Sequence, residues 1–277
     1  MQDDQNAQQF ELNGGAPALR GEQSGDGEPI VLLHGLTATR RYVVMGSRYL
    51  PTHGRRIVPY DARGHGESDP APEPGAYEYS DLAGDLERVL DGLGIEHATL
   101  AGASMGAHTA VAFAVSRPER VSGLVLITPA YDGRVREEGL AEWDALADGL
   151  ARGGIEGFVE AWTPPADERW RETATLVVRQ RLGRHRHLDA VADALRAVPR
   201  SKPFESMDEL ESIEIPALVV GSRDESDPGH PLAVAEEYAR RLPRARLLVE
   251  EPGKSPLAWQ GAQLSRAIDE FLGGNGE

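Results

Sequence analysis

Short apolar runs recur along the chain and are separated by longer segments with helical spacing of apolar residues. The runs are continuously apolar rather than alternating, which is typical of strands that are covered on both faces of a parallel sheet. They predict strands at residues 30–33, 56–60, 98–101, 124–127, 217–220 and 245–249. The helical spacing predicts helices over residues 80–93, 104–117, 232–242 and 256–272. This alternation predicts an α/β fold with a mostly parallel central sheet flanked by helices.

One long segment breaks the alternation. Between about Asp132 and Met207 the pattern contains no convincing strand, and its apolar residues repeat at helical spacing. We therefore predict a core domain made of residues 1–131 and 208–277, with residues 132–207 inserted as a helical lid. Ligands bind at the carboxyl edge of open α/β sheets, so we expect the lid to lie over that edge.

The composition narrows the classes of partner. The chain has 277 residues, 40% of them apolar, and 29 basic against 45 acidic residues give a formal net charge of -16. A surface with this much negative charge repels phosphate backbones and anionic lipid. We therefore expect neither nucleic acid nor a membrane as a partner. The start of the chain lacks a signal pattern, and no apolar run approaches the ~20 residues of a membrane span. We expect a cytoplasmic protein, or otherwise the mature form of an exported one.

Cysteine is absent from the sequence, which excludes disulfides, thiolate metal sites and cysteine nucleophiles. No set of histidines and carboxylates has the spacing of metal ligands, so we expect no metal. Nothing in the sequence implies a cofactor.

The strongest chemical signal is G-x-S-x-G at residues 102–106, between a predicted strand and a predicted helix. In this context the pattern is a nucleophile elbow, which predicts Ser104 as the nucleophile. The glycines suit a turn too tight for side chains, and the helix N-terminus adds positive potential below the serine. The alternative is a glycine-rich turn in which Ser104 is a spectator.

Two more motifs follow predicted strands in the same register. His34-Gly35-Leu36 follows the first, and residues 61–68 read D-x-R-G-H-G-x-S after the second. With the elbow, they make the chain resemble the α/β-hydrolase fold superfamily over nearly its full length. The resemblance implies a serine esterase with a lid inserted after the sixth strand. It also implies an oxyanion hole formed by the backbone N–H groups of Leu36 and Met105, while His34 and His65 support the loops.

The same resemblance implies an acid after the strand at 217–220. Gly221-Ser222-Arg223-Asp224 matches the family's G-x-x-D, so Asp224 is the first choice. Asp227, in the same loop, is the second choice, and Asp132 is a distant third.

The chain departs from the family at the base, because Lys254 occupies the usual position of the histidine. Lys254 could serve as the base only if its pKa fell from about 10.4 to near 7–8, and a neighbouring Asp224 would oppose that fall. His230 could replace the missing histidine, since it lies within reach and has a suitable pKa; alternatively, it only closes the start of the next helix. A third hypothesis is a silent site in which Lys254 and Asp224 form an ion pair.

The remaining histidines, and the aromatic residues and arginines of the predicted lid, also need an interpretation. We expect His108 to be packed along its helix, and His185 and His187 to lie on a solvated face of the lid. Trp143, Phe158, Trp162 and Trp170 either line an acyl pocket or form the core beneath the lid. The lid arginines either pair with a substrate carboxylate or, as an acidic chain favours, balance local glutamates.

These observations predict a serine hydrolase acting on a small carboxylic ester, thioester or lactone. Ser104 attacks the carbonyl, His230 is the preferred base, and Asp224 or Asp227 orients it. One alternative is a hydrolase-fold protein that binds a small molecule without hydrolysing it. Another is a lyase-type enzyme that uses the oxyanion hole for a non-hydrolytic step. The partner is a small-molecule substrate in the enzymatic cases, and a homodimer stays open.

Overall fold

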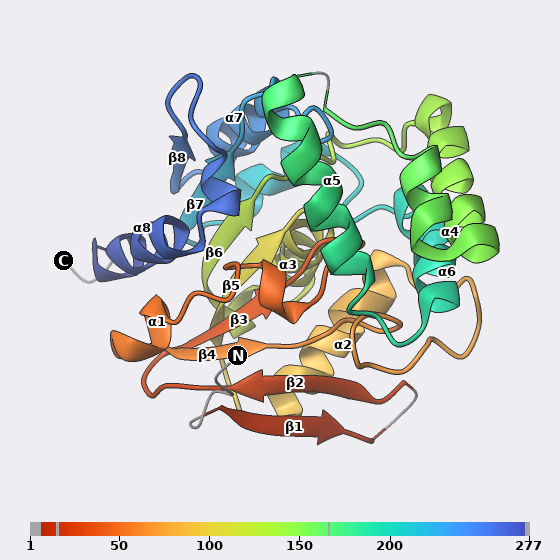
Figure 1. Cartoon of the computed structure of the whole chain (residues 1–277). Helices are drawn as coiled ribbons and strands as arrows, with labels where there is room; N and C mark the ends of the chain where they lie inside the picture. The colour runs from red at the N-terminus through yellow and green to blue at the C-terminus, as the bar shows by residue number, and fades with distance from the viewer. Residues whose placement is uncertain (1–6, 15–16, 166, 275–277) are drawn as a thin grey trace.

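A six-stranded sheet forms the centre of the molecule, with neighbouring strands all parallel and in the order β4-β3-β5-β6-β7-β8 (Figure 1). The computed structural model describes residues 7–14, 17–165 and 167–274. The strands are β3 Pro29–Leu33, β4 Arg56–Pro59, β5 Ala98–Ala103, β6 Val121–Ile127, β7 Ala217–Gly221 and β8 Ala245–Val249. All six strands that the apolar runs predict are present, and the predicted α/β architecture is confirmed.

The strands are apolar on both faces because helices cover both sides of the sheet. Val31 and Leu33 of β3 pack in one cluster with helices α2 Tyr79–Gly92, α3 Met105–Ser116 and α7 Leu232–Arg241. The intervening Ile30 and Leu32 pack in another cluster with α1 Tyr49–Thr52 and α8 Gly261–Gly274. Successive residues of a strand point to opposite faces, so a continuous apolar run supplies both clusters.

Two details differ from the predicted elements. Strands β1 Gln8–Leu12 and β2 Leu19–Gln23 form an antiparallel pair that the sequence did not reveal, because β1 is largely polar and exposed. The helix predicted over residues 256–272 is a 3₁₀ turn, η6 Leu257–Trp259, followed by α8. Gly261 begins α8 against the backbone of Val44, where a side chain would overlap the Val44 carbonyl.

Helices occupy the segment between β6 and β7, and its described residues, 132–165 and 167–207, contain no strand. They are α4 Leu140–Ala161, α5 Glu168–Leu182 and α6 Leu188–Ala197, with 3₁₀ turns η3 Glu137–Gly139 and η4 Val198–Arg200, and η5 Met207–Ser212 at its end. At Gly154, φ is 60° and α4 folds back on itself. The two halves touch at Gly149 and Gly157, where any side chain would overlap the opposite backbone (Figure 1).

The inserted helices pack on loops at the carboxyl ends of the central strands. Leu150, Val178 and Leu195, one from each inserted helix, share an apolar cluster with Leu36 and Met105. These last two residues follow β3 and β5. The insertion therefore lies against the edge at which the sequence places its candidate chemistry. No helix in the described part of the chain is both long and apolar enough to cross a membrane.

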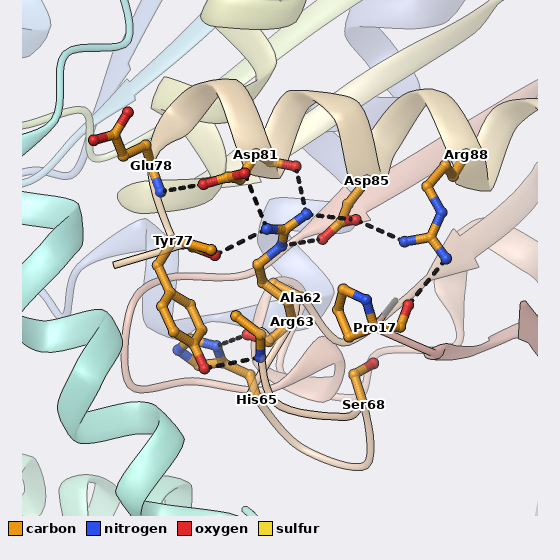
Figure 2. A network of polar contacts seen from close by, with 12 residues as sticks. Pro17, Ala62, Arg63, His65, Ser68, Tyr77, Glu78, Asp81, Asp85 and Arg88 are labelled. Carbon is orange, nitrogen blue, oxygen red and sulfur yellow. Dashed lines mark hydrogen bonds and ion pairs between the residues drawn. The ribbon is translucent and has the colours of Figure 1, made fainter. Parts of the chain in front are cut away.

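A buried ion pair fixes the loop that follows β4 (Figure 2). Arg63 donates to both carboxylate oxygens of Asp85 on α2, at 2.7 and 3.0 Å, and to the Ala76 carbonyl at 2.8 Å. The side chain of Asp85 is 1% exposed. In the same loop, the Ala62 N–H donates to His34 Nε2 at 2.9 Å. Arg63 thus holds the D-x-R-G-H-G-x-S loop to α2, while Ala62 holds it to the loop after β3.

Because Arg63 would keep a buried charge without its main partner, Asp85→Ala should lower the free energy of unfolding by about 3–5 kcal/mol. The matched control is Asp91→Ala on the same helix, because Asp91 pairs with Arg120 at the surface. That change should cost less than about 1 kcal/mol. Urea denaturation followed by circular dichroism measures both values, and equal losses would contradict this role of the Arg63–Asp85 pair.

Candidate active site

The predicted elbow is present at the end of β5. Ser104 lies between β5 and the first residue of α3, with φ 51° and ψ −113°. A positive φ is strained for a residue with a side chain, and such strain clusters at functional sites. The flanking glycines are required by close backbone contacts: a side chain at Gly102 would overlap the Gly106 carbonyl, and one at Gly106 would overlap that of Leu33.

A chain of two hydrogen bonds runs from the elbow to the loop after β7. His230 Nε2 lies 2.9 Å from Ser104 Oγ, and His230 Nδ1 lies 2.8 Å from Asp227 Oδ1. A carboxylate can only accept, so Nδ1 carries the proton and Nε2 is free to accept from the serine hydroxyl. The arrangement is that of a Ser–His–Asp triad. The sequence analysis anticipated Ser104 and His230 in these positions.

Asp224 is not the partner of His230, so its ranking as first choice is wrong in geometry. Its Oδ1 instead accepts from the backbone N–H of Leu232 at 2.8 Å, at the start of α7. A tight turn, in which the His230 N–H donates to the Asp227 carbonyl, brings the side chains of Asp227 and His230 together. The match to G-x-x-D located the loop, but it could not show which carboxylate would face a histidine from that same loop.

The remaining acid and base candidates lie elsewhere. Lys254 is exposed in the turn after β8, and its ammonium has no hydrogen bond or ion pair within residues 7–14, 17–165 and 167–274. The hypothesis of a Lys254–Asp224 ion pair is therefore wrong. Asp132 accepts from Arg136 at 2.6 Å and does not contact His230.

The two expected oxyanion-hole residues lie beside the elbow. Met105 is the first residue of α3, so its N–H has no acceptor within the helix. The loop holding Leu36 is close, because a side chain on Gly35 would lie 3.5 Å from Ser104 Cβ. Leu36 and Met105 also pack in the same apolar cluster. Within the described chain, neither N–H donates to another group. Both are therefore free for a ligand.

The charge of Asp227 tunes the histidine. Burial by itself lowers the pKa of His230, but the charge and hydrogen bond of Asp227 outweigh burial and raise that pKa above its ordinary 6.5. For Asp227, burial works to raise the pKa, but His230 and the nearby positive charge of Arg181 bring it below its ordinary value. The pair thus favours an ionised carboxylate beside a histidine that readily accepts a proton.

Three histidines have the supporting roles expected of them. His34 Nδ1 donates to the Gly35 carbonyl while its Nε2 accepts from Ala62, and burial lowers its pKa. His65 is buried against the Arg63 carbonyl. His108 Nε2 accepts from the backbone N–H of Ala130 and Tyr131, and burial lowers its pKa to about 3. All three are held neutral by their surroundings.

The expectation that His185 lies on a solvated face is wrong. Its Nδ1 accepts from the Gly66 N–H at 2.9 Å, and its Nε2 donates to the Thr37 carbonyl at 3.1 Å. Burial lowers its pKa to about 4. His185 thus ties the end of α5 to the loops after β3 and β4, a long-range contact that a charged local sequence does not reveal. His187, two residues on, is half-buried at the start of α6.

The aromatic residues of the insertion divide between the two interpretations. Phe158 is buried in the cluster beneath the helices, and Trp162 packs against that cluster, so both belong to the core. Trp143 is 36% exposed. Trp170 packs edge to face on Trp259, and its buried Nε1 has no hydrogen-bond partner.

Removing the charge of Asp227 tests this electrostatic arrangement directly. Asp227→Asn should lower the pKa of His230, because the interaction that opposes burial is lost. Asp224→Ala should leave that pKa unchanged and cost about 1 kcal/mol of stability, as the loss of a helix-capping bond does. An NMR titration of the His230 ring protons reads the pKa. A larger fall in Asp224→Ala than in Asp227→Asn would overturn the assignment of the carboxylate that faces His230.

The chain is similar to known proteins over most of its length. The family model described as alpha/beta hydrolase fold matches residues 28–262. The chain is 30% identical, over 92% of its length and 94% of the relative's, to a Bacillus subtilis protein provisionally named 2-succinyl-6-hydroxy-2,4-cyclohexadiene-1-carboxylate synthase. It is 34% identical, over 79% of its length and 77% of the relative's, to a 2-hydroxy-6-oxononadienedioate/2-hydroxy-6-oxononatrienedioate hydrolase of Burkholderia vietnamiensis.

A thermophilic esterase from Thermogutta terrifontis, solved with malate bound, has a similar structure. The TM-score is 0.82 at 26% identity, covering 97% of this chain and 99% of the esterase. The match of the family model to most of the chain establishes the relationship that the elbow and the parallel sheet indicate. The chain belongs to the alpha/beta hydrolase family and is an enzyme of the hydrolase type.

Proposed function

We propose that this protein is a serine hydrolase that cleaves a small carboxylic ester, thioester or lactone. The observation that carries the proposal is the hydrogen-bonded chain from Ser104 Oγ through His230 to Asp227. A nucleophile in hydrogen-bond contact with a base, and a base oriented by a third group, is the arrangement that nucleophilic catalysis requires.

The reaction follows from the positions of these groups. His230 Nε2 takes the hydroxyl proton as Ser104 Oγ forms a bond to the substrate carbonyl carbon. The negative oxygen of the tetrahedral intermediate accepts hydrogen bonds from the N–H groups of Leu36 and Met105. Asp227 stabilises the imidazolium, which then gives its proton to the departing oxygen or sulfur. His230 next removes a proton from water as the water oxygen bonds to the acyl carbon. The bond from that carbon to Ser104 Oγ then breaks, and His230 returns the proton to Oγ, which releases the acid and restores the hydroxyl.

The proposed base lies at an unusual place in the chain. In the alpha/beta hydrolase family the histidine usually follows the last strand, where this chain has the exposed Lys254. Here acid and base both come from the loop after β7, three residues apart. The elbow and one loop therefore supply the complete triad, and Lys254 has no part in it. We further propose that the inserted helices act as a lid over these groups, which their packing on Leu36 and Met105 supports.

A lyase-type reaction is the second candidate, favoured by the synthase name of the Bacillus subtilis relative. In such a reaction His230 would act as a base on the substrate, and the two N–H groups would stabilise an enolate without an acyl-serine. Turnover that survives Ser104→Ala would support this candidate. A site that only binds a ligand would show neither turnover nor a reactive serine.

A fluorophosphonate probe tests whether Ser104 is an activated nucleophile. The probe needs a reactive serine and an oxyanion hole, but not the natural substrate. Intact-mass measurement should show one adduct per chain in the wild type and none in Ser104→Ala. Folded wild-type protein that stays unlabelled would remove the hydrolase proposal and leave the binding alternative.

Separate substitutions of the two candidate bases test the origin of the base. His230→Ala should lower kcat/KM for a simple aryl ester by about 10²–10⁴-fold, because proton transfer from the serine is lost. Lys254→Ala should change it by no more than about twofold, as expected for an exposed side chain outside the site. The opposite ranking of the two variants would overturn the assignment of His230.

A further inference from the structure

Helix α5 lies close to the proposed catalytic groups. Its Val178 and Leu182 pack in the apolar cluster that contains Leu36 and Met105. Just beyond its end, the contacts of His185 with Thr37 and Gly66 hold it to the loops after β3 and β4. In Figure 1 the green helix α5 crosses in front of the central strands, between α7 and the loop after β3. The face of α5 that carries Val178 and Leu182 therefore packs on the residues that follow β3 and β5.

Most arginines at this helix have acidic partners. Arg169 pairs with Asp167 at the start of α5, and Arg179 pairs with Glu156 of α4, at 2.5 and 2.7 Å respectively. Both arginines are exposed. These pairs agree with the expectation that the arginines of the insertion balance local acids.

Arg181 does not follow this pattern. Its Nε is buried without a hydrogen-bond partner, and its guanidinium forms no ion pair with any residue in the described part of the chain. It lies close enough to Asp227 and His230 to influence the titration of both.

Arg181 is half-buried, and a guanidinium nitrogen that is buried without a hydrogen-bond partner needs an explanation. Burial lowers the pKa of Arg181, and the charge of Asp227 offsets this only in part. The Asp227 Oδ1 nearest the site is already hydrogen-bonded to His230. The protein therefore has a cation near its proposed catalytic groups, and no carboxylate in the described part of the chain is within ion-pair distance of it.

We propose that Arg181 binds a carboxylate of the substrate, so that the natural substrate is a small ester, thioester or lactone that carries a negative charge near the scissile carbonyl. This inference rests on the proposed function. A guanidinium binds a carboxylate with two parallel hydrogen bonds, which gives orientation as well as affinity. Because Arg181 acts electrostatically on both His230 and Asp227, a carboxylate bound to it would lie near the base.

The net charge of the chain makes a local cation necessary for such a substrate. With a formal net charge of -16, the protein as a whole repels an anion. Selection for a carboxylate must therefore come from a cation in contact with it. Removing Arg181 should abolish that selection without removing the chemistry.

A pair of esters that differ only in charge tests the inference: monophenyl adipate and phenyl hexanoate. The wild type should have the higher kcat/KM for the adipate ester. Arg181→Gln should lower kcat/KM for the adipate ester by about 100-fold, mainly through KM, because the buried charge pair with the substrate is lost. The same variant should change kcat/KM for the hexanoate ester by no more than about threefold. The matched control, Arg179→Gln, removes the same charge two residues away and should leave both esters unchanged.

Stability distinguishes a binding residue from a structural one. Because Arg181 is half-buried and its buried Nε has no partner in the free protein, Arg181→Gln should leave Tm unchanged or raise it, since a partly desolvated charge is removed. A large fall in Tm, or an equal loss of kcat/KM for both esters, would show instead that Arg181 only holds His230 and Asp227 in place. Either result would overturn the inference.

A binding measurement separates this inference from the proposed function. Calorimetry with adipate and the Ser104→Ala protein should detect binding that is lost when Arg181→Gln is added. This readout needs no turnover, so it stands even if the fluorophosphonate fails to label Ser104. Equal adipate binding in the single and double variants, or no binding in either, would overturn the role of Arg181.

Discussion

The close approach of three backbone segments at the elbow is the constraint on which the site depends. β3, β5 and the start of α3 come together so tightly that Gly102 and Gly106 have no room for a side chain. This contact leaves Ser104 with a positive φ and brings the loop that holds Leu36 beside it. The proposed nucleophile and the N–H groups of Leu36 and Met105 therefore lie close together because these backbone segments pack without room for side chains.

Asp227 and His230 belong to the loop after β7, so their positions do not depend on the close backbone contacts at the elbow. Asp227 and His230 meet through a short turn in the loop after β7, and a hydrogen bond from His230 to Ser104 Oγ connects them to the elbow. Asp224 stabilises the same loop by bonding to the first residue of α7. Because His230 contacts Ser104 from this loop, no histidine is needed at the usual position after β8. The exposed Lys254 occupies that position.

Arg63 and Arg181 differ in the partners that surround their charges. Arg63 is enclosed by Asp85, a backbone carbonyl and Asp81, and it holds a loop in place. Arg181 is half-buried near Asp227 and His230, and its buried Nε has no hydrogen-bond partner. The first arrangement is complete without a ligand, whereas the second lacks an anion. The contrast is the physical basis for giving the two arginines different roles.

The sequence alone determined the sheet, its flanking helices, the elbow and the loop that holds the acid and base. Continuous apolar runs such as residues 30–33 predict a strand buried on both faces, and the glycines at 102 and 106 predict a tight turn, because these are local requirements. The polar strand β1 gave no such signal.

Only the tertiary structure decided which polar side chains face one another. Asp224 and Asp227 are nearly equivalent in sequence, and a turn geometry places only Asp227 against His230. His185 looked solvated in its charged surroundings, yet it connects α5 to two loops. Arg181 resembles the other arginines of its helix in sequence, but in the structure its Nε is buried without a hydrogen-bond partner. Hydrogen bonds and charge pairs depend on distances between residues far apart in the chain, and local pattern does not encode those distances.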